Sequence, residues 1–313
     1  MSRLDVLTFW DHKYKLGEWI FTMFQANPSS PPKTERPLLK PGDVSVESKR
    51  WKDAGLPIDF LLLTAKPCEL LNCLYYLSDR FKSNKDGLGF VYFGKIGNGD
   101  EKLKIAVIQC NVGSTTPQGS TIVVPVAVRE LRPKAVICVG YCAGLKETKV
   151  KFGDVIISSK LATYAPIKVT KDKTIDRGVQ VPASPRLSEI LRSAALGWKA
   201  PLKNSNELDV KVHTDGLLLS GPEVISSDER RAELTERFPD AIGVEMEGEG
   251  LFVAAHQYKF EWAVIKGVSD FAGDNKSDSD PWRPFSSLMA ASLVAHILSD
   301  VHAFEEWRHY GDK

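Results

Sequence analysis

Two apolar runs, 241–244 and 262–268, are each followed by acidic side chains. Glu245 and Glu247 follow the first run, and Asp270 follows the second. Short apolar runs that alternate with helix-like stretches are typical of parallel strands, and ligands of such sheets bind beyond the carboxyl ends of the strands. If the two strands are neighbours in one sheet, the three acids lie at one rim. The pattern predicts an α/β protein with a carboxylate-lined site.

Similar runs recur along the chain, at 58–64, 103–108, 135–140 and 211–221. The chain has 313 residues, of which 43% are hydrophobic and 26% charged, which are ordinary values for a globular protein. We expect one three-layer α/β domain over residues 46–313, with a central twisted mixed β-sheet flanked by helices.

Residues 1–45 differ from the rest, because an aromatic-rich segment is followed by a proline-rich connector. Two interpretations remain open for this N-terminal arm. It packs on the main domain, or it contacts another subunit or partner.

Composition excludes several classes. The net charge of +1 gives no bulk attraction to nucleic acid or an anionic membrane, and no window reaches the roughly 20 apolar residues of a membrane span. The N-terminal segment lacks the apolar core of a signal peptide. The five cysteines have no CxxC spacing and the six histidines are scattered, so we expect a cytoplasmic protein without a metal or other cofactor.

A further acid, Glu69, follows the apolar run 58–64 and precedes a helix-like stretch. This position places Glu69 in the first turn of a helix at the carboxyl end of a strand. Taken alone, this position is better explained by a surface glutamate that suits the helix dipole.

Two turns rich in small residues follow strand-like runs. Cys110 opens a turn whose free N–H groups and hydroxyls suit a ribose or phosphate, and Cys142, Ala143 and Gly144 allow a flat ligand to approach the backbone. Ordinary capping or tight turns remain the alternatives. Neither turn has P-loop or dinucleotide-binding spacing.

These acids suit cleavage of an N-glycosidic bond, whose transition state resembles an oxocarbenium ion. Carboxylates that bind the ribose hydroxyls stabilise the developing positive charge, and a buried acid protonates the departing purine. A hydrolase also needs a group that orients or deprotonates water.

Four motifs carry a family resemblance: VGYCAGL at 139–145, FGDVIIS at 152–158, VEMEGEG at 244–250 and VSDFAGD at 268–274. In this order and spacing they resemble the purine/uridine phosphorylase and methylthioadenosine/adenosylhomocysteine nucleosidase superfamily. The resemblance runs from about residue 58 to 298, some three-quarters of the chain, and implies a nucleoside phosphorylase-like fold.

The resemblance implies catalytic roles for three residues. Glu247 would bind the ribose hydroxyls, Asp270 would protonate the purine N7, and Glu69 would contact the attacking water. The structural alternatives are a solvated helix start for Glu247, a surface position that suits the helix dipole for Glu69, and a helix N-cap for Asp270.

It also implies substrate contacts. Met246 would pack under the sugar, Val224 and Ile225 would lie at the base pocket, Ser269 would neighbour the acid, and Glu245 would support the site. Core packing is the alternative for Met246. The chain departs from the nucleosidase pattern at Val224, where relatives tend to have an aromatic residue, and in the turns at 110–113 and 141–144.

Hydrolysis is favoured over phosphorolysis. Phosphorylase relatives bind phosphate with a Gly-Asp-Pro-x-Arg type of turn after the first strand, whereas residues 65–69 here contain no arginine and end in Glu69. A phosphorylase, or a non-catalytic nucleotide-sensing module, is the alternative.

The sequence of residues 260–276 resembles the immune-effector and animal branch of the nucleosidase-type relatives. Members of this branch cleave adenine from nucleotides such as ATP. A triphosphate requires cations near the 5′ end of the site, and Lys66, Lys266, Lys276 and Arg283 are the candidates. Because relatives assemble, we also expect a homo-oligomer.

Overall fold

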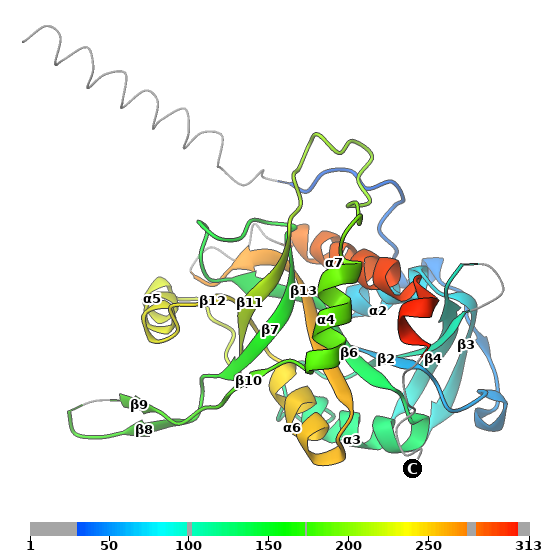
Figure 1. Ribbon diagram of the computed structural model, residues 1–313, viewed down its shortest axis with the longest axis horizontal. Helices are drawn as coiled ribbons and strands as arrows, with labels where there is room; N and C mark the ends of the chain where they lie inside the picture. The colour runs from blue at the N-terminus through cyan, green and yellow to red at the C-terminus, as the bar shows by residue number, and fades with distance from the viewer. Residues whose placement is uncertain (1–29, 99–101, 173, 274–279, 306–313) are drawn as a thin grey trace, which may run out of the picture. The chain divides into compact units, whose positions relative to one another are not determined.

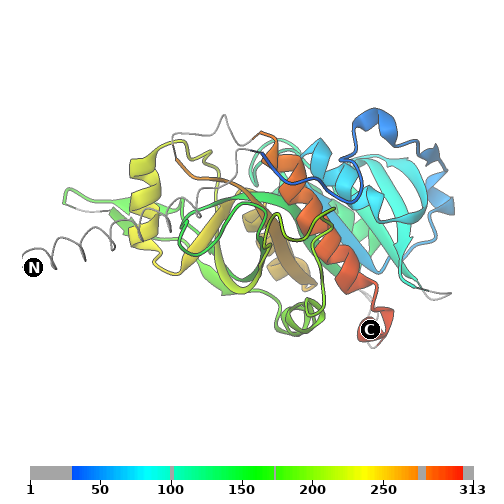
Figure 2. The same ribbon diagram turned by 90° about the horizontal axis from the view of Figure 1, so that it is seen from above.

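The computed structural model describes residues 30–98, 102–172, 174–273 and 280–305 (Figures 1 and 2). Residues Pro31–Lys313 form one compact unit. Most of the expected arm, together with Lys276, lies outside the described residues, and the division at residue 45 stays a prediction. The described end of the connector is tied to this unit, since the Glu35 amide donates to the Pro201 carbonyl over 2.9 Å.

A mixed sheet of eleven strands forms the centre of this unit and confirms the expected α/β fold (Figure 1). The strand order is β1-β3-β4-β5-β2-β6-β12-β11-β7-β10, and β13 pairs with β6 and β7. The strands β8 and β9 form a separate hairpin. The strands are β1 (Glu47–Ser48), β2 (Phe60–Thr64), β3 (Ser78–Lys85), β4 (Gly89–Ile96), β5 (Leu103–Gln109), β6 (Ala135–Gly144), β7 (Val155–Thr163), β8 (Ile167–Val169), β9 (Thr174–Asp176), β10 (Gln180–Pro182), β11 (Val212–Ser220), β12 (Ala241–Glu245) and β13 (Glu261–Phe271).

Helices cover both faces of the sheet. They are α2 (Pro67–Tyr75), α3 (Ser120–Leu131), α4 (Pro185–Ala194), α5 (Asp228–Arg237), α6 (Gly248–Tyr258) and α7 (Trp282–Leu298). Strand β2 shows how the faces divide, because successive side chains of a strand point to opposite sides. Phe60 and Leu62 pack with α2, α4 and α7, whereas Leu61 and Leu63 pack with α3 and α6. Helix α7 is apolar around most of its circumference, which fits its burial across the sheet.

Strand β6 is longer than its apolar run predicts. For residues 141–144 the sequence left two interpretations open, a close approach of a ligand to the backbone or a tight turn, and the structure continues the strand to Gly144. The extension has partners on both sides: Phe271 of β13 lies opposite Gly144, and so does Gly243 of β12. The tight-turn alternative therefore does not hold at this position, because the small residues there permit close pairing of strands.

The pairing also positions the acids. Both β12 and β13 pair with β6, so Glu245 at the end of β12 and Asp270 near the end of β13 lie on strands that share one neighbour. The register of β13 against β6 shifts between Val268 and Asp270. Such an irregularity redirects a side chain, and here it lies next to the candidate acid.

Within the described part of the chain, the structure contains no helix of the length and apolarity that crossing a membrane requires.

Candidate active site

Glu69 lies in the first turn of α2 with its carboxylate folded back onto the chain. It accepts hydrogen bonds from the backbone amides of Ala65 and Lys66, over 2.7 and 2.9 Å, and from that of Tyr141 on β6, over 3.0 Å. Pro67 at the start of α2 suits this helix N-terminus. Burial raises the pKa of Glu69, although Lys266 opposes the shift. A raised pKa brings the carboxyl group closer to neutral pH, where it can act as a general acid or base.

Glu245 and Glu247 are held at the start of α6. The Glu245 carboxylate accepts the amides of Glu247 and Gly248, over 3.0 and 2.9 Å, which satisfies free N–H groups of the helix N-terminus. One oxygen of Glu247 accepts the Gly113 amide over 3.1 Å. The turn at 110–117 therefore binds this glutamate rather than standing apart from it.

Lys266 balances these charges from inside the protein. Its side chain is fully buried, and Nζ lies 3.1 Å from Glu247 Oε2 and 3.9 Å from Glu245 Oε2. Burial alone would lower the pKa of Lys266, but the carboxylates of Glu247, Glu69 and Glu245 raise it well above its ordinary value. An ammonium group held in this way is not placed to meet a phosphate, so the expected substrate contact of Lys266 finds no support in the geometry.

The cluster around Lys266 also contains three side chains of the types that bind metal ions. Ligand atoms of Cys138, Glu245 and Glu247 lie within 4.8 Å of one another. The ammonium group of Lys266 already supplies the positive charge at this place. Burial raises the pKa of Cys138 well above its ordinary value, so its thiol is neutral and a poor metal ligand.

Asp270 lies near the end of β13 and is mostly buried. The Ser269 hydroxyl donates to Asp270 Oδ1 over 2.7 Å. The same hydroxyl lies 3.3 Å from the carbonyl of Cys142 on β6. Ser269 thus ties the candidate acid to the neighbouring strand, as a neighbour of the acid would.

One cavity of about 220 Å³ brings most of the expected site residues together. Those on its wall are Lys66, Glu69, Cys142, Ala143, Val224, Ile225, Glu245, Met246, Glu247 and Asp270. They come from β2–α2, β6, the segment after β11, β12–α6 and β13. Five chain segments that are distant in sequence therefore meet at one hollow.

Four expected site residues do not line this cavity: Lys266, Ser269, Gly144 and Cys110. Lys266 and Ser269 lie behind the wall and contact residues that form it. Gly144 permits strand packing, since a Cβ there would lie 2.6 Å from the Phe271 ring. Cys110 is buried at the end of β5, and burial raises its pKa to about 12.

Two of the expected cations lie at the cavity. Lys66 and Arg283 both line it, and Arg283 Nη1 pairs with Asp280 over 2.5 Å. Arg283 stands at the start of α7, so it approaches the cavity from the same side of the sheet as α2.

The cavity is also lined by residues that the sequence did not indicate: Ala65, Val112, Tyr141, Glu223 and Val244. Val112 lies in the turn after β5 and Tyr141 in the small-residue end of β6, and both stretches stood out in the sequence. Glu223 has no such signal, because it precedes Val224 in an irregular segment and its contacts arise from the fold.

The fold and cavity define a class of α/β proteins with a ligand site where several strands of one sheet end. The model of the phosphorylase superfamily matches residues 65–298, and the chain belongs to this family.

Curated relatives agree with this assignment. A "Death domain-containing ATP nucleosidase" from Amphimedon queenslandica is 33% identical over 280 residues, which are 81% of this chain and 51% of that protein. The chain thus spans about half the length of that relative. A "5'-methylthioadenosine/S-adenosylhomocysteine nucleosidase" from Maridesulfovibrio salexigens is 26% identical over 198 residues, 63% of this chain and 80% of that protein.

Solved structures support the fold. The methylthioadenosine/adenosylhomocysteine nucleosidase from Neisseria meningitidis, in complex with methylthio-immucillin-A, has a TM-score of 0.64 at 22% identity. The match covers 78% of this chain and 99% of that one. It confirms the nucleoside phosphorylase-like architecture.

Proposed function

We propose that this protein is an N-ribosyl hydrolase that releases adenine from an adenine nucleoside or nucleotide, with ATP as a candidate substrate. The observation that carries the proposal is the meeting of Glu69, Glu247 and Asp270, from three chain segments, on one cavity wall. Two curated relatives are named as nucleosidases of adenine compounds, which agrees with this chemistry.

Each acid has a separate task in the proposed reaction. Asp270 donates a proton to N7 of the base, so that adenine leaves as a neutral molecule. Glu247 accepts hydrogen bonds from the ribose hydroxyls and faces the positive charge that develops on the sugar. Met246 packs under the ribose. Glu69, in its ionised form, accepts a proton from the water that attacks the anomeric carbon.

The geometry at α2 favours water over phosphate as the acceptor. The first amides of a helix commonly bind anions. Here the carboxylate of Glu69 already accepts the amides of Ala65 and Lys66. A phosphate ion would meet this buried carboxylate instead of free N–H groups, so phosphorolysis is the less favoured reaction.

A nucleotide substrate finds its cations at one part of the cavity. Lys66 and Arg283 are on its wall, and the 5′ phosphates would lie beside them. The expected contributions of Lys266 and Lys276 are not part of this proposal, since Lys266 is buried against Glu247 and Lys276 lies outside the described residues.

An assay of base release tests the proposal and its alternatives. Purified protein is incubated with ATP, adenosine, methylthioadenosine and adenosylhomocysteine, with and without phosphate, and free adenine is separated by chromatography. Adenine release that does not depend on phosphate supports hydrolysis. Release that requires phosphate indicates a phosphorylase, and no release from any of the four compounds favours a non-catalytic nucleotide-binding module.

Replacement of the candidate acid gives a second test. Asp270→Asn removes the proton donor, and we expect kcat to fall at least about a hundredfold, the usual range for loss of a general acid. Asp215→Asn serves as the matched control, because Asp215 is an exposed carboxylate on β11. Equal activity of the two variants would remove Asp270 from the mechanism.

The same proposal includes a homo-oligomer that acts in the cytoplasm. The five cysteines are unpaired, as in a reducing compartment. Light scattering during gel filtration measures the mass of the particle, and a mass equal to one 34.7 kDa chain contradicts the oligomer.

A further inference from the structure

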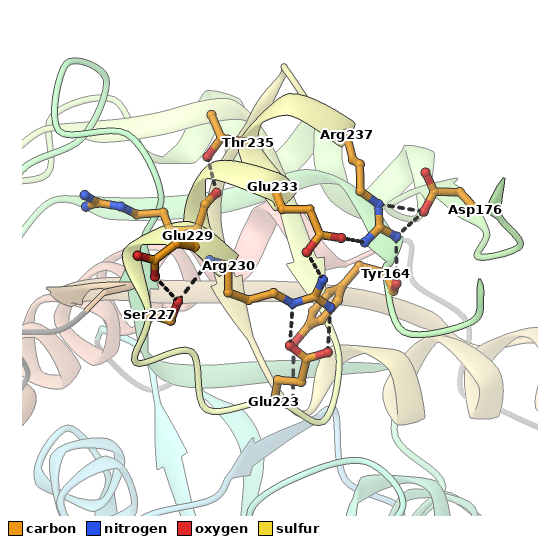
Figure 3. Close-up of polar contacts among 10 residues, drawn as sticks. Tyr164, Asp176, Glu223, Ser227, Glu229, Arg230, Glu233, Thr235 and Arg237 are labelled. Carbon is orange, nitrogen blue, oxygen red and sulfur yellow. Dashed lines mark hydrogen bonds and ion pairs between the residues drawn. The ribbon is translucent and has the colours of Figure 1, made fainter. Parts of the chain in front are cut away.

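Arginines of α5 form ion pairs with the surrounding carboxylates, Glu223 among them (Figure 3). Glu223 lines the cavity. Arg230 binds the Glu223 carboxylate with two hydrogen bonds, from Nε to Oε2 over 2.8 Å and from Nη2 to Oε1 over 2.7 Å. Its third nitrogen, Nη1, donates to Glu233 over 2.6 Å. All three nitrogens of this guanidinium group are therefore engaged, and the paired geometry fixes Glu223 in position as well as in charge.

Glu223 belongs to the 221–225 loop, which is the first part of the connection from β11 to α5, and residues 223–225 line one wall of the cavity. Its backbone is held at alternate residues. The Gly221 amide donates to the Glu245 carbonyl over 3.2 Å, the Glu223 amide donates to the Tyr164 hydroxyl over 3.2 Å, and the Ile225 carbonyl accepts the Gly273 amide over 3.3 Å. Among these anchors, Arg230 holds the loop through a side chain that comes from α5.

The 221–225 loop packs tightly against Tyr164, and α5 contacts the same tyrosine. The ring of Tyr164 is fully buried, and a Cβ at Gly221 would lie 2.5 Å from it. Arg237, two turns after Arg230, donates to the Tyr164 carbonyl over 3.1 Å and pairs with Asp176 of β9. Near the N-terminus of the same helix, a Cβ at Gly273 would lie 2.3 Å from Asp228 Oδ1. Helix α5 thus contacts both the 221–225 loop and the segment that follows Asp270.

We propose that Arg230 is a positioning residue for base recognition. Its two hydrogen bonds to Glu223 hold the 221–225 loop in the position from which the loop contacts the base. The inference rests on the proposed function, in which Val224 and Ile225 contact adenine. Arg230 and Glu223 are both partly exposed, so their ion pair contributes little to folding stability. Its effect is on the geometry of one wall, and a displaced wall weakens base binding without altering the acids that perform the chemistry.

The test compares Arg230→Ala with Arg231→Ala. Arg231 is the neighbouring residue on α5, pairs with Glu147 and Asp228, and makes no hydrogen bond or ion pair with Glu223. We expect Arg230→Ala to raise KM for adenosine by about three- to tenfold with kcat within about twofold of wild type, the pattern of lost uniform binding. Arg231→Ala should leave both constants near wild type.

Two additional variants separate position from charge. In Glu223→Arg/Arg230→Glu the pair is reversed, and a KM lower than that of Arg230→Ala supports the proposal, because the exchanged groups form the same contact. Arg230→Lys keeps the charge but loses the two-pronged grip, so its KM should lie between wild type and Arg230→Ala. A KM for Arg230→Ala equal to that of Arg231→Ala overturns the proposal.

Hydrogen exchange provides a readout that does not require turnover. The amides of the 221–225 loop should exchange faster in Arg230→Ala than in Arg231→Ala. If wild-type protein releases no base from any compound, the proposed function fails, and the exchange result still decides whether Arg230 positions the loop. Equal exchange in the two variants contradicts that role.

Discussion

At the scale of single residues, acidic side chains line the cavity, and a buried lysine next to the cavity wall neutralises part of their charge. Glu69, Glu245, Glu247 and Asp270 all line it, whereas the buried Lys266 contributes the positive charge that faces them from the core. Burial raises the pKa of Glu69 and of Glu245, because a carboxylate loses its hydration there. The site therefore holds carboxyl groups whose protonation differs from that of carboxyls in water.

The raised pKa of Glu69 predicts the acid limb of the pH profile. In the proposed reaction Glu69 must be ionised to accept a proton from water, so kcat/KM should fall as the pH decreases through its pKa. That limb should lie above the ordinary glutamate value of about 4.3. The check is kcat/KM for adenosine between about pH 4 and 8. Glu69→Gln should lose most of its activity, and an unchanged profile in this variant would assign the limb to another group.

Lys266 makes a separate prediction about stability. Lys266→Met leaves Glu245 and Glu247 without their buried counter-charge, which should lower the free energy of unfolding by about 3–5 kcal/mol. Urea denaturation followed by circular dichroism measures this change. Lys160→Met, at an exposed position on β7, is the matched control. Glu247→Gln/Lys266→Met should recover part of the loss, and no difference between the two single variants contradicts the pairing.

At the scale of elements, the helix and strand pattern was largely predictable, but its pairing was not. The expected strands at 58–64, 103–108 and 211–221 correspond to β2, β5 and β11. Each of these has a local signal, a continuous apolar run. That β12 and β13 both pair with β6 is a long-range fact, and no local pattern encodes it.

The same division applies to site residues. Glu247 and Asp270 follow apolar strands, and this position indicated their place in the cavity. Lys266 differs from these two residues. It lies inside an apolar run and was expected to contact the substrate, but the structure places it against the carboxylates of Glu245 and Glu247. Glu223 and Arg230 are ordinary charged residues in sequence, and only the folded chain brings α5 against the 221–225 loop.

Two glycines allow a methyl group to be added either against a site residue or against the packed backbone. A Cβ at Gly140 on β6 would lie 2.0 Å from Glu69 Oε1, whereas a Cβ at Gly267 on β13 would lie 2.0 Å from the Ser286 carbonyl oxygen on α7. A side-chain carboxylate can move, but the backbone of a packed helix cannot. Gly140→Ala should therefore displace Glu69 and lower kcat/KM at least about tenfold with a modest loss of stability, as overpacking usually costs about 1–3 kcal/mol.

Gly267→Ala should produce the larger loss of stability, because α7 and β13 must separate to admit the methyl group. Thermal unfolding of the two variants, with kcat/KM measured beside it, checks the difference. A lower melting temperature for Gly140→Ala than for Gly267→Ala would show that β6 is the less tolerant strand and would contradict the argument.

At the scale of the whole molecule, charge does little to attract a nucleotide from a distance. The net charge is +1, and the cavity wall itself carries several acids. A triphosphate must therefore be drawn and held by local cations, of which Lys66 and Arg283 are on the wall. This separates ATP from adenosine, since adenosine has no charge for these cations to bind.

Salt then discriminates between the two substrates. Screening weakens interactions with exposed cations, with a Debye length of about 10 Å at 0.1 M salt and about 3 Å at 1 M. We expect kcat/KM for ATP to fall several-fold between about 50 and 500 mM NaCl, whereas the value for adenosine should change less than about twofold. Arg283→Ala should reduce both the ATP activity and its salt dependence, because it removes one of the cations being screened. A parallel response of ATP and adenosine to salt, in wild type and variant alike, would mean that the phosphates do not meet these cations, and it would direct the proposal toward substrates with an uncharged 5′ group.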